Sequence, residues 1–125
     1  MADYLIKLEY APGLEYEELE SMARDAFPEC KVLIAHEFYA LRSMKVLKIK
    51  KSPFIQAWIN IRHKQKDGFT YLAIYNAQSL LGRFLMGYWI NLRYRKDFYS
   101  DVLISMEREL KDHYTVLPCE GESIF

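Results

Sequence analysis

Three histidines and two cysteines carry the most reactive side chains of the chain. His36, His63 and His113 lie far apart, and no H-E-x-x-H stretch brings two of them together. Cys30 and Cys119 are also distant, without the C-x-x-C spacing of a zinc or redox site. We therefore expect no metal site and no cofactor. Two cysteines without a disulfide pattern indicate reduced thiols, and hence a cytoplasmic protein.

The other arrangements that could support catalysis are also incomplete. Cys30 follows the end of an expected helix, where the helix dipole disfavours a thiolate. Gly82 and Gly87 are not followed by the Lys-Ser/Thr pair of a phosphate-binding loop, and no Gly-x-Ser-x-Gly turn occurs. These patterns identify no catalytic residue and favour a protein without catalytic machinery. An enzyme whose site forms from scattered residues is the third alternative.

A basic and aromatic surface is the one suggestive feature. The chain has no net charge, yet residues 31–66 hold nine bases against one acid and residues 1–30 hold two bases against eight acids. Within the basic segment and after it, seven cationic or aromatic residues share one face of the expected strands: Lys48, Lys50, Trp58, Arg62, Lys64, Tyr71 and Tyr75. Rings that stack on bases and cations that bind phosphates are typical of single-stranded nucleic-acid or other polyanion binding. Alternatively, a helix over 79–95 covers this face and its rings belong to the core.

Alternation of apolar and polar residues predicts the strands that display this face. The expected strands cover 3–10, 31–35, 44–51, 54–64 and 69–75, and residues 36–43 fit either a strand or a helical connector. Asp67-Gly68 is typical of a two-residue hairpin turn. Such a turn pairs Lys64 with Tyr71 and Ile61 with Ile74. One face of the hairpin and its neighbours then holds an apolar set under helices: Ile55, Ile59, Ile61, Leu72 and Ile74.

Three helices are expected around this sheet. Leu19, Met22, Ala23, Ala26 and Phe27 recur at helical spacing after a run of glutamates and before Pro28. Residues 80–92 are apolar nearly all round, which indicates burial on two sides. A last helix is expected to start at Asp97, with Phe98, Val102, Met106 and Leu110 on one face.

The segment 80–92 leads to the favoured function. A small single-sheet domain offers few partners for such a helix, and twofold dimers are the commonest oligomers. We therefore expect a homodimer whose interface contains Leu81, Phe84, Leu85, Tyr88, Trp89 and Leu92. Trp89 and Tyr88 beside basic residues also suit peripheral membrane contact, which is less favoured, as is nucleic acid. No uncharged run is long enough for a transmembrane segment.

Length and composition agree with one domain. The chain has 125 residues, of which 51% are hydrophobic, 27% charged and 15% aromatic. These values fit a globular domain rather than a disordered or disulfide-stapled chain. The sequence thus predicts a single α+β domain over 1–117 with a loose tail at 118–125. Its sheet is mainly antiparallel with four to five strands, in the element order β-α-β-β-β-β-α-α.

Overall fold

The computed structural model describes residues 4–39, 42–51, 55–77 and 88–117. It contains β1 (Tyr4–Glu9), α1 (Tyr16–Ala26), β2 (Lys31–Tyr39), β3 (Arg42–Lys50), β4 (Gln56–Lys64), β5 (Phe69–Ala77), α3 (Tyr88–Lys111) and β6 (Val116–Leu117). The predicted α+β class with a mainly antiparallel sheet is confirmed. The tail predicted at 118–125 lies outside the described residues.

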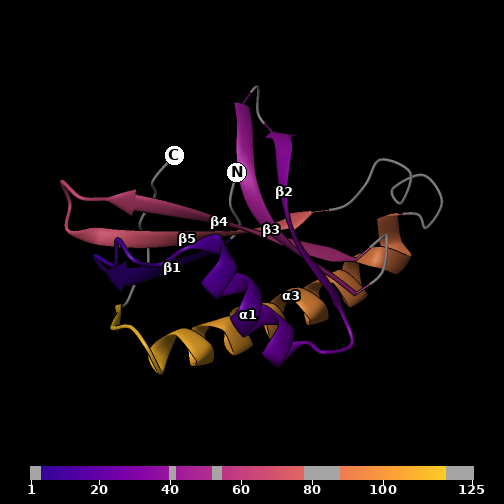
Figure 1. Cartoon of the computed structure of the whole chain (residues 1–125). Coiled ribbons are helices and arrows are strands. Elements are labelled where there is room, and N and C mark those ends of the chain that lie inside the picture. Colours follow the sequence, from indigo (N-terminus) through magenta and orange to yellow (C-terminus); the bar gives the residue numbers. More distant parts are fainter. Residues whose placement is uncertain (1–3, 40–41, 52–54, 78–87, 118–125) are drawn as a thin grey trace.

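One antiparallel sheet of six strands organises the described chain. The strand order is β2-β3-β4-β5-β1-β6, so β1 returns from the start of the chain to pair with β5. The prediction of four to five strands was too low because β6 has only two residues, which is too short to show alternation. Figure 1 shows α1 and α3 together on one side of the sheet.

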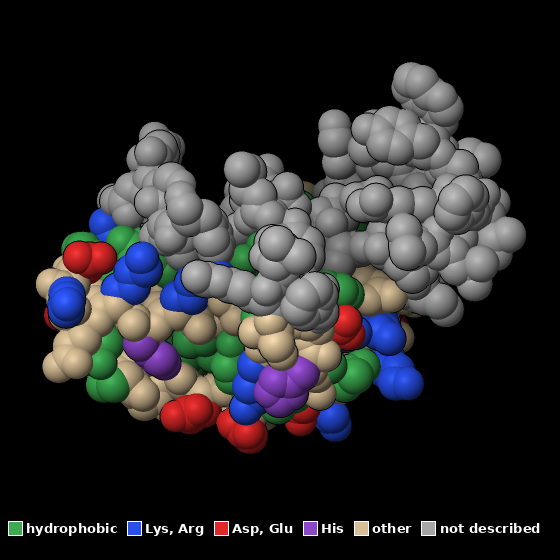
Figure 2. Space-filling model, turned by 90° about the horizontal axis from the view of Figure 1, so that it is seen from above, with side chains coloured by type: hydrophobic (Ala, Val, Ile, Leu, Met, Phe, Trp, Pro, Cys, Tyr) green, Lys and Arg blue, Asp and Glu red, His purple; other side chains and the backbone are tan. Residues whose placement is uncertain are grey.

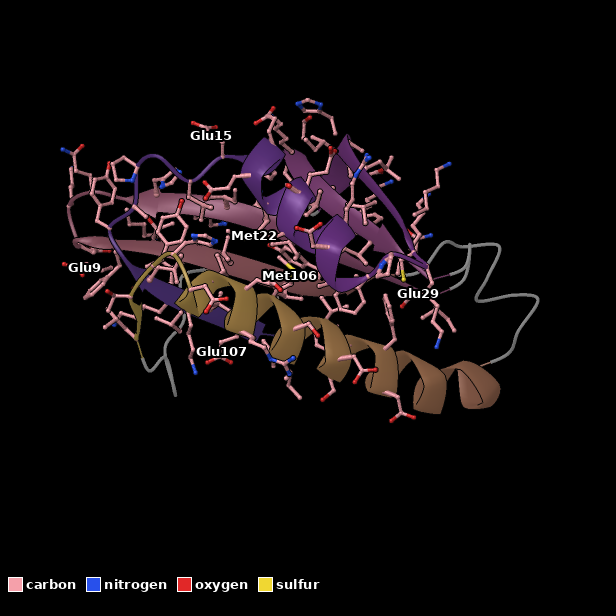
Figure 3. The ribbon with its side chains drawn as sticks, turned by 60° about the horizontal axis from the view of Figure 1, so that its bottom comes forward. Glu9, Glu15, Met22, Glu29, Met106 and Glu107 are labelled. Atoms are coloured by element: carbon pink, nitrogen blue, oxygen red, sulfur yellow. The ribbon has the colours of Figure 1, made fainter. Side chains whose placement is uncertain are left out.

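The core lies between the sheet and the two helices. Met22 of α1 and Met106 of α3 both lie toward the sheet (Figure 3), and both are buried. The predicted apolar face is confirmed, with Ile59, Leu72 and Ile74 fully buried and the two other isoleucines packed against the same cluster. This layer stabilises the fold by removing apolar area from water.

The C-terminal helix differs from the sequence prediction. α3 runs without a break from Tyr88 to Lys111, so Asp97 lies inside a helix and does not begin one. The 24 residues of α3 contain neither proline nor glycine, and nothing in them interrupts helical hydrogen bonding. One long helix therefore replaces the end of the predicted 80–92 helix and the predicted last helix.

The turn between β4 and β5 also differs. Residues 65–68 form a four-residue connection in which the amide of Gly68 donates to the carbonyl of Lys64 (3.1 Å). Gly68 has a φ of 78°, which glycine adopts without strain. Lys64 therefore pairs with Phe69 and Ile61 with Leu72, two positions from the predicted register. A shift of two residues keeps every side chain on its predicted face, because strands alternate with a period of two.

The β2–β3 hairpin contains the segment 36–43, for which the sequence allowed either a strand or a helical connector, and it bends away from the sheet. Residues 36–39 continue β2, and β3 begins at Arg42. The pairing of β3 with β4 covers four positions, from Leu47 with Ile59 to Lys50 with Gln56. Beyond Leu47 the hairpin rises on the side of the sheet opposite the helices (Figure 1). We call residues 35–39 and 42–46 the arm.

Candidate functional site

Cross-strand pairing brings the predicted cationic and aromatic residues onto one sheet face, opposite α1 and α3. Lys48 pairs with Trp58, and Trp58 pairs with Tyr75, which forms one row across three strands. Tyr71 pairs with Arg62 on one side and with Lys7 of β1 on the other, which forms a second row. Lys50 and Lys64 follow on the same faces of β3 and β4. We call this set the upper face; Lys7 is a member that the sequence analysis missed, because the return of β1 to β5 is a long-range pairing.

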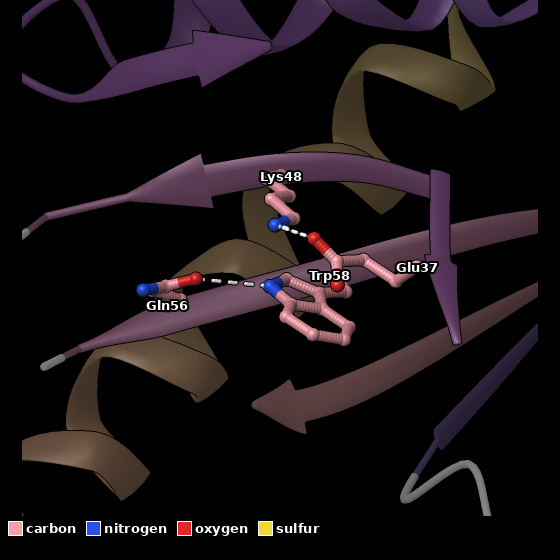
Figure 4. Close-up of polar contacts among 4 residues, drawn as sticks. All are labelled: Glu37, Lys48, Gln56 and Trp58. Atoms are coloured by element: carbon pink, nitrogen blue, oxygen red, sulfur yellow. Dashed lines mark hydrogen bonds and ion pairs between the residues drawn. The ribbon is translucent and has the colours of Figure 1, made fainter. Parts of the chain in front are cut away.

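Lys48 is the centre of a closed polar cluster where the arm meets the upper face. Its ammonium group makes an ion pair with Glu37 of β2 and lies 4.8 Å from the centre of the Trp58 ring. The Trp58 indole N–H donates to Gln56 Oε1 at 3.0 Å (Figure 4). The Lys48 side chain is 11% exposed, so this ion pair is screened less than a surface pair. The cluster holds β2, β3 and β4 together at the bend.

The two predicted tyrosines of the upper face are not displayed to solvent. Tyr71 is 5% exposed and Tyr75 is 4% exposed, and both rings have further interaction partners. Figure 2 views the molecule from the arm side and shows Lys and Arg side chains on its described surface. In this structure the two tyrosines are buried, and Trp58 is half-buried. The helix expected over 79–95 does not cover them in its described part, because α3 lies on the opposite face of the sheet, and residues 79–87 lie outside the described residues.

A tyrosine from α1 fills the split between β3 and β4. If the ladder continued past Leu47, Lys45 would lie opposite Ile61. Instead the Ile61 amide donates to the Tyr16 hydroxyl oxygen (2.9 Å), and that hydroxyl donates to the Lys45 carbonyl (3.0 Å). Asn60 Nδ2 donates to the same carbonyl at 2.8 Å. Burial raises the pKa of Tyr16, partly offset by its hydrogen bonds from Ile61 and Asn60. The hydroxyl thus replaces a direct strand contact and satisfies main-chain groups that the bend would otherwise leave unpaired.

The same contact fixes which main-chain groups of β2 point away from the sheet. Because the Lys45 carbonyl is turned toward β4, its pair His36 in β2 turns its own amide and carbonyl to the outer side. Arg24 of α1 donates to the carbonyl of Val32 at 3.3 Å, which places that carbonyl on the outer side as well. Alternation along a strand then puts the groups of Ile34 outward too. β2 is at the end of the strand order, so no other described strand pairs with these groups, and we call them the β2 edge.

The interface predicted from the apolar segment is described only in part. Leu81, Phe84 and Leu85 lie outside the described residues. Tyr88, Trp89 and Leu92 are in the first turns of α3, and only their helical backbone is described.

The histidines and cysteines do not converge in the described ranges. His63 contacts the Thr70 hydroxyl (3.1 Å) and the Leu14 carbonyl (3.2 Å), and Thr70 accepts from the Ala11 amide (2.9 Å), so this histidine anchors the loop before α1. Burial and the adjacent Glu29 raise the pKa of the Cys30 thiol. Among residues 4–39, 42–51, 55–77 and 88–117, no group of three metal-ligating side chains forms and no helix could cross a bilayer.

Comparisons with known proteins add no functional information: no protein-family model, curated protein or solved structure matches this chain.

Proposed function

We propose that this chain is a small, non-catalytic interaction protein that binds another polypeptide as an added strand along β2. The observation that carries this proposal is the outer edge of β2, where Val32, Ile34 and His36 turn their main-chain groups away from the sheet. An extended segment placed there gains main-chain hydrogen bonds, and alternate side chains supply specificity.

The composition of this edge supports the proposal. Natural sheets protect long edge strands with prolines, bulges or inward-pointing charges. β2 has nine residues, and its stretch 32–35 contains no charge and no proline. Lys31 and Glu37 lie on either side of that stretch. The result is an apolar edge long enough to receive a strand, with charges at its two ends.

Selection from a displayed library of random nonapeptides tests the proposal. Peptides selected on the wild-type protein are expected to bind His36→Pro at least about tenfold more weakly, because proline removes an outward amide while edge strands tolerate it. His36→Ala, which keeps the amide and loses the same exposed side chain, is the matched control and should bind normally. Equal binding to wild type and His36→Pro would refute strand addition at β2.

The dimer through 80–92 is a separate surface of the same proposed interaction protein. It rests on the all-round apolar character of that segment. Phe84→Glu places a charge on the proposed interface and should remove the part of the self-association that this surface supplies. A mass unchanged by Phe84→Glu contradicts this surface.

Polyanion binding on the upper face is the second candidate. Its support is the excess of cations on one sheet face. Five bases share that face with two acids, Glu9 and Glu37; the bases are Lys7, Lys48, Lys50, Arg62 and Lys64. Because Tyr71 and Tyr75 are packed, we expect phosphate contacts and stacking on Trp58 rather than stacking on three rings. Affinity for a single-stranded oligonucleotide should then fall with salt and in Lys50→Gln, whereas salt-independent binding would contradict this candidate.

A further inference from the structure

The β2 edge constrains the registers in which a strand can pair with it. Val32, Ile34 and His36 must lie opposite residues whose main-chain groups also point outward. If the added strand is β2 of a second copy, twofold symmetry leaves a short series of antiparallel registers that meet this condition. In one of them Ile34 lies opposite Ile34 of the second copy and Val32 lies opposite His36 of the second copy.

The charges at the two ends of the edge favour this register. Centred on Ile34, the pairing places Lys31 opposite Glu37 of the second copy, and symmetry repeats the pair at the other end. A centre moved to Ala35 puts Lys31 opposite Tyr39, and a centre moved to Leu33 puts it opposite Ala35. Opposite charges in direct cross-strand pairs are stabilising, so the sequence of β2 is complementary to itself in the Ile34-centred register.

The contacts of the two charged residues leave room for this pair. Lys31 is exposed. Glu37 uses its Oε1 atom for Lys48, its side chain is 30% exposed, and its Oε2 atom makes no hydrogen bond to the described residues. Figure 4 shows the Glu37 side chain reaching from β2 toward Lys48, with its carboxylate between Lys48 and Trp58 and one oxygen bonded to Lys48. An ammonium group from a second copy can therefore bind the other oxygen while the ion pair within the chain is kept.

The main chain also fits. Three outward pairs form across the axis, and each antiparallel pair of this type exchanges two hydrogen bonds. The Val32 carbonyl already accepts from Arg24, whose 61% exposed side chain also pairs with Glu20, but a carbonyl oxygen has two lone pairs and can accept a second bond. The half-buried side chains of Leu33, Ile34 and Ala35 then lie at the centre of the contact.

From these features we propose that the strand received by the β2 edge is β2 of a second copy, in the antiparallel register centred on Ile34. Two six-stranded sheets then join into one continuous sheet, and Lys31 of each copy binds Glu37 of the other. This inference rests on the proposed function, because it names the partner of the edge described there.

Charge-reversal variants mixed in pairs test the register. Lys31→Glu alone and Glu37→Lys alone each place two like-charged pairs across the axis, and each should weaken self-association about tenfold. A mixture of the two variants restores both opposite-charge pairs across the axis, so heterodimers should form more tightly than either variant with itself. They should form less tightly than the wild type, because Glu37→Lys also breaks the ion pair with Lys48. Sedimentation velocity over a concentration series, with one variant carrying a fluorophore, measures both affinities.

The outcomes separate this inference from the function on which it rests. A wild-type mass of one chain at every concentration, or no preference for heterodimers, overturns the second-copy inference; peptide binding that depends on residue 36 would still support strand addition. A dimer that survives His36→Pro but dissociates in Phe84→Glu overturns the inference and assigns the interface to 80–92. Thermal unfolding of each variant shows whether weaker self-association comes from the interface or from a less stable fold.

Discussion

The β4–β5 and β2–β3 hairpins have strands of the same length but different support. Every residue of β4 pairs with β5, and six residues of β5 pair with β1 on the other side. Among the described strands β2 pairs with β3 alone, and β3 pairs with β4 over four positions. The first hairpin is therefore held by the sheet, whereas the second depends on side chains from α1 and on the Lys48 cluster.

This difference separates the most buried part of the sheet from the strand at which we propose interaction. Ile59, Leu72 and Ile74 of the first hairpin are fully buried, but Leu33, Ile34 and Ala35 of β2 are half-buried, and no described strand pairs with the outer side of β2. Elements with fewer buried contacts open at lower free-energy cost. A strand that receives a partner belongs to this less supported part, because burial by the partner can supply what the monomer lacks.

Matched truncations of isoleucine should give the largest effect. Ile59→Ala removes a fully buried side chain and should lower the free energy of unfolding by about 2–5 kcal/mol. Ile34→Ala makes the same chemical change in half-buried β2 and should cost less than about 2 kcal/mol. Urea denaturation measures both. Equal losses would show that the two hairpins are supported equally, which contradicts the comparison.

Tyr16→Phe tests how the arm is held. The variant keeps the ring but removes the hydroxyl that accepts from Ile61 and donates to Lys45, which leaves two partly buried main-chain groups without those bonds. We expect a loss of about 1–3 kcal/mol in the free energy of unfolding and faster hydrogen exchange at the Ile61 amide. Tyr10→Phe is the control, since the Tyr10 hydroxyl makes no hydrogen bond to the described residues. Unchanged exchange at Ile61 would mean that Tyr16 does not close the split.

Local patterns in the sequence predict the faces of this sheet well and its long-range pairings poorly. The alternation of apolar and polar residues correctly predicted Ile59 and Leu72 in the core and Lys48, Trp58 and Tyr75 on the other face. The predicted length of the β4–β5 turn was wrong, but this error shifted the register by two residues and left the faces unchanged. Periodicity depends on neighbours in the chain, so it is robust to such errors.

Features that depend on distant residues were not predictable in this way. The role of Tyr16 requires β3 and β4 to separate beside α1, and the hydroxyl bonds Ile61, which is 45 positions away. The open edge of β2 follows from the strand order, which no local pattern contains. The burial of Tyr71 and Tyr75 likewise depends on tertiary packing, so exposed aromatics and core aromatics look alike in the sequence.

Alkaline pH should produce the smallest effect. It tests a second attachment of α1, in the same first turn of the helix that holds Tyr16. The Tyr114 hydroxyl, after α3, donates to Glu18 Oε2 at 2.7 Å and so ties α1 to the well-supported half of the molecule. Burial and the Glu18 carboxylate raise the pKa of Tyr114 from 10.0 to about 12. Since the folded state holds the proton more tightly than the unfolded state, this contribution is complete below pH 10 and is lost as the pH rises toward about 12.

Tyr114→Phe should therefore cost about 0.5–1.5 kcal/mol at neutral pH and show a shallower loss of stability than the wild type above pH 10. Urea denaturation at neutral pH and at intervals up to about pH 12 measures both slopes. Part of the alkaline loss should persist in the variant, because the pKa of Tyr16 is also raised and ionisation there would weaken the arm. Adding Tyr16→Phe to Tyr114→Phe should remove that remaining alkaline loss. Comparison of the double variant with each single variant then separates the contact of Tyr16 with the arm from the contact of Glu18 with Tyr114. Parallel slopes for wild type and Tyr114→Phe would contradict a role for this hydrogen bond in holding α1.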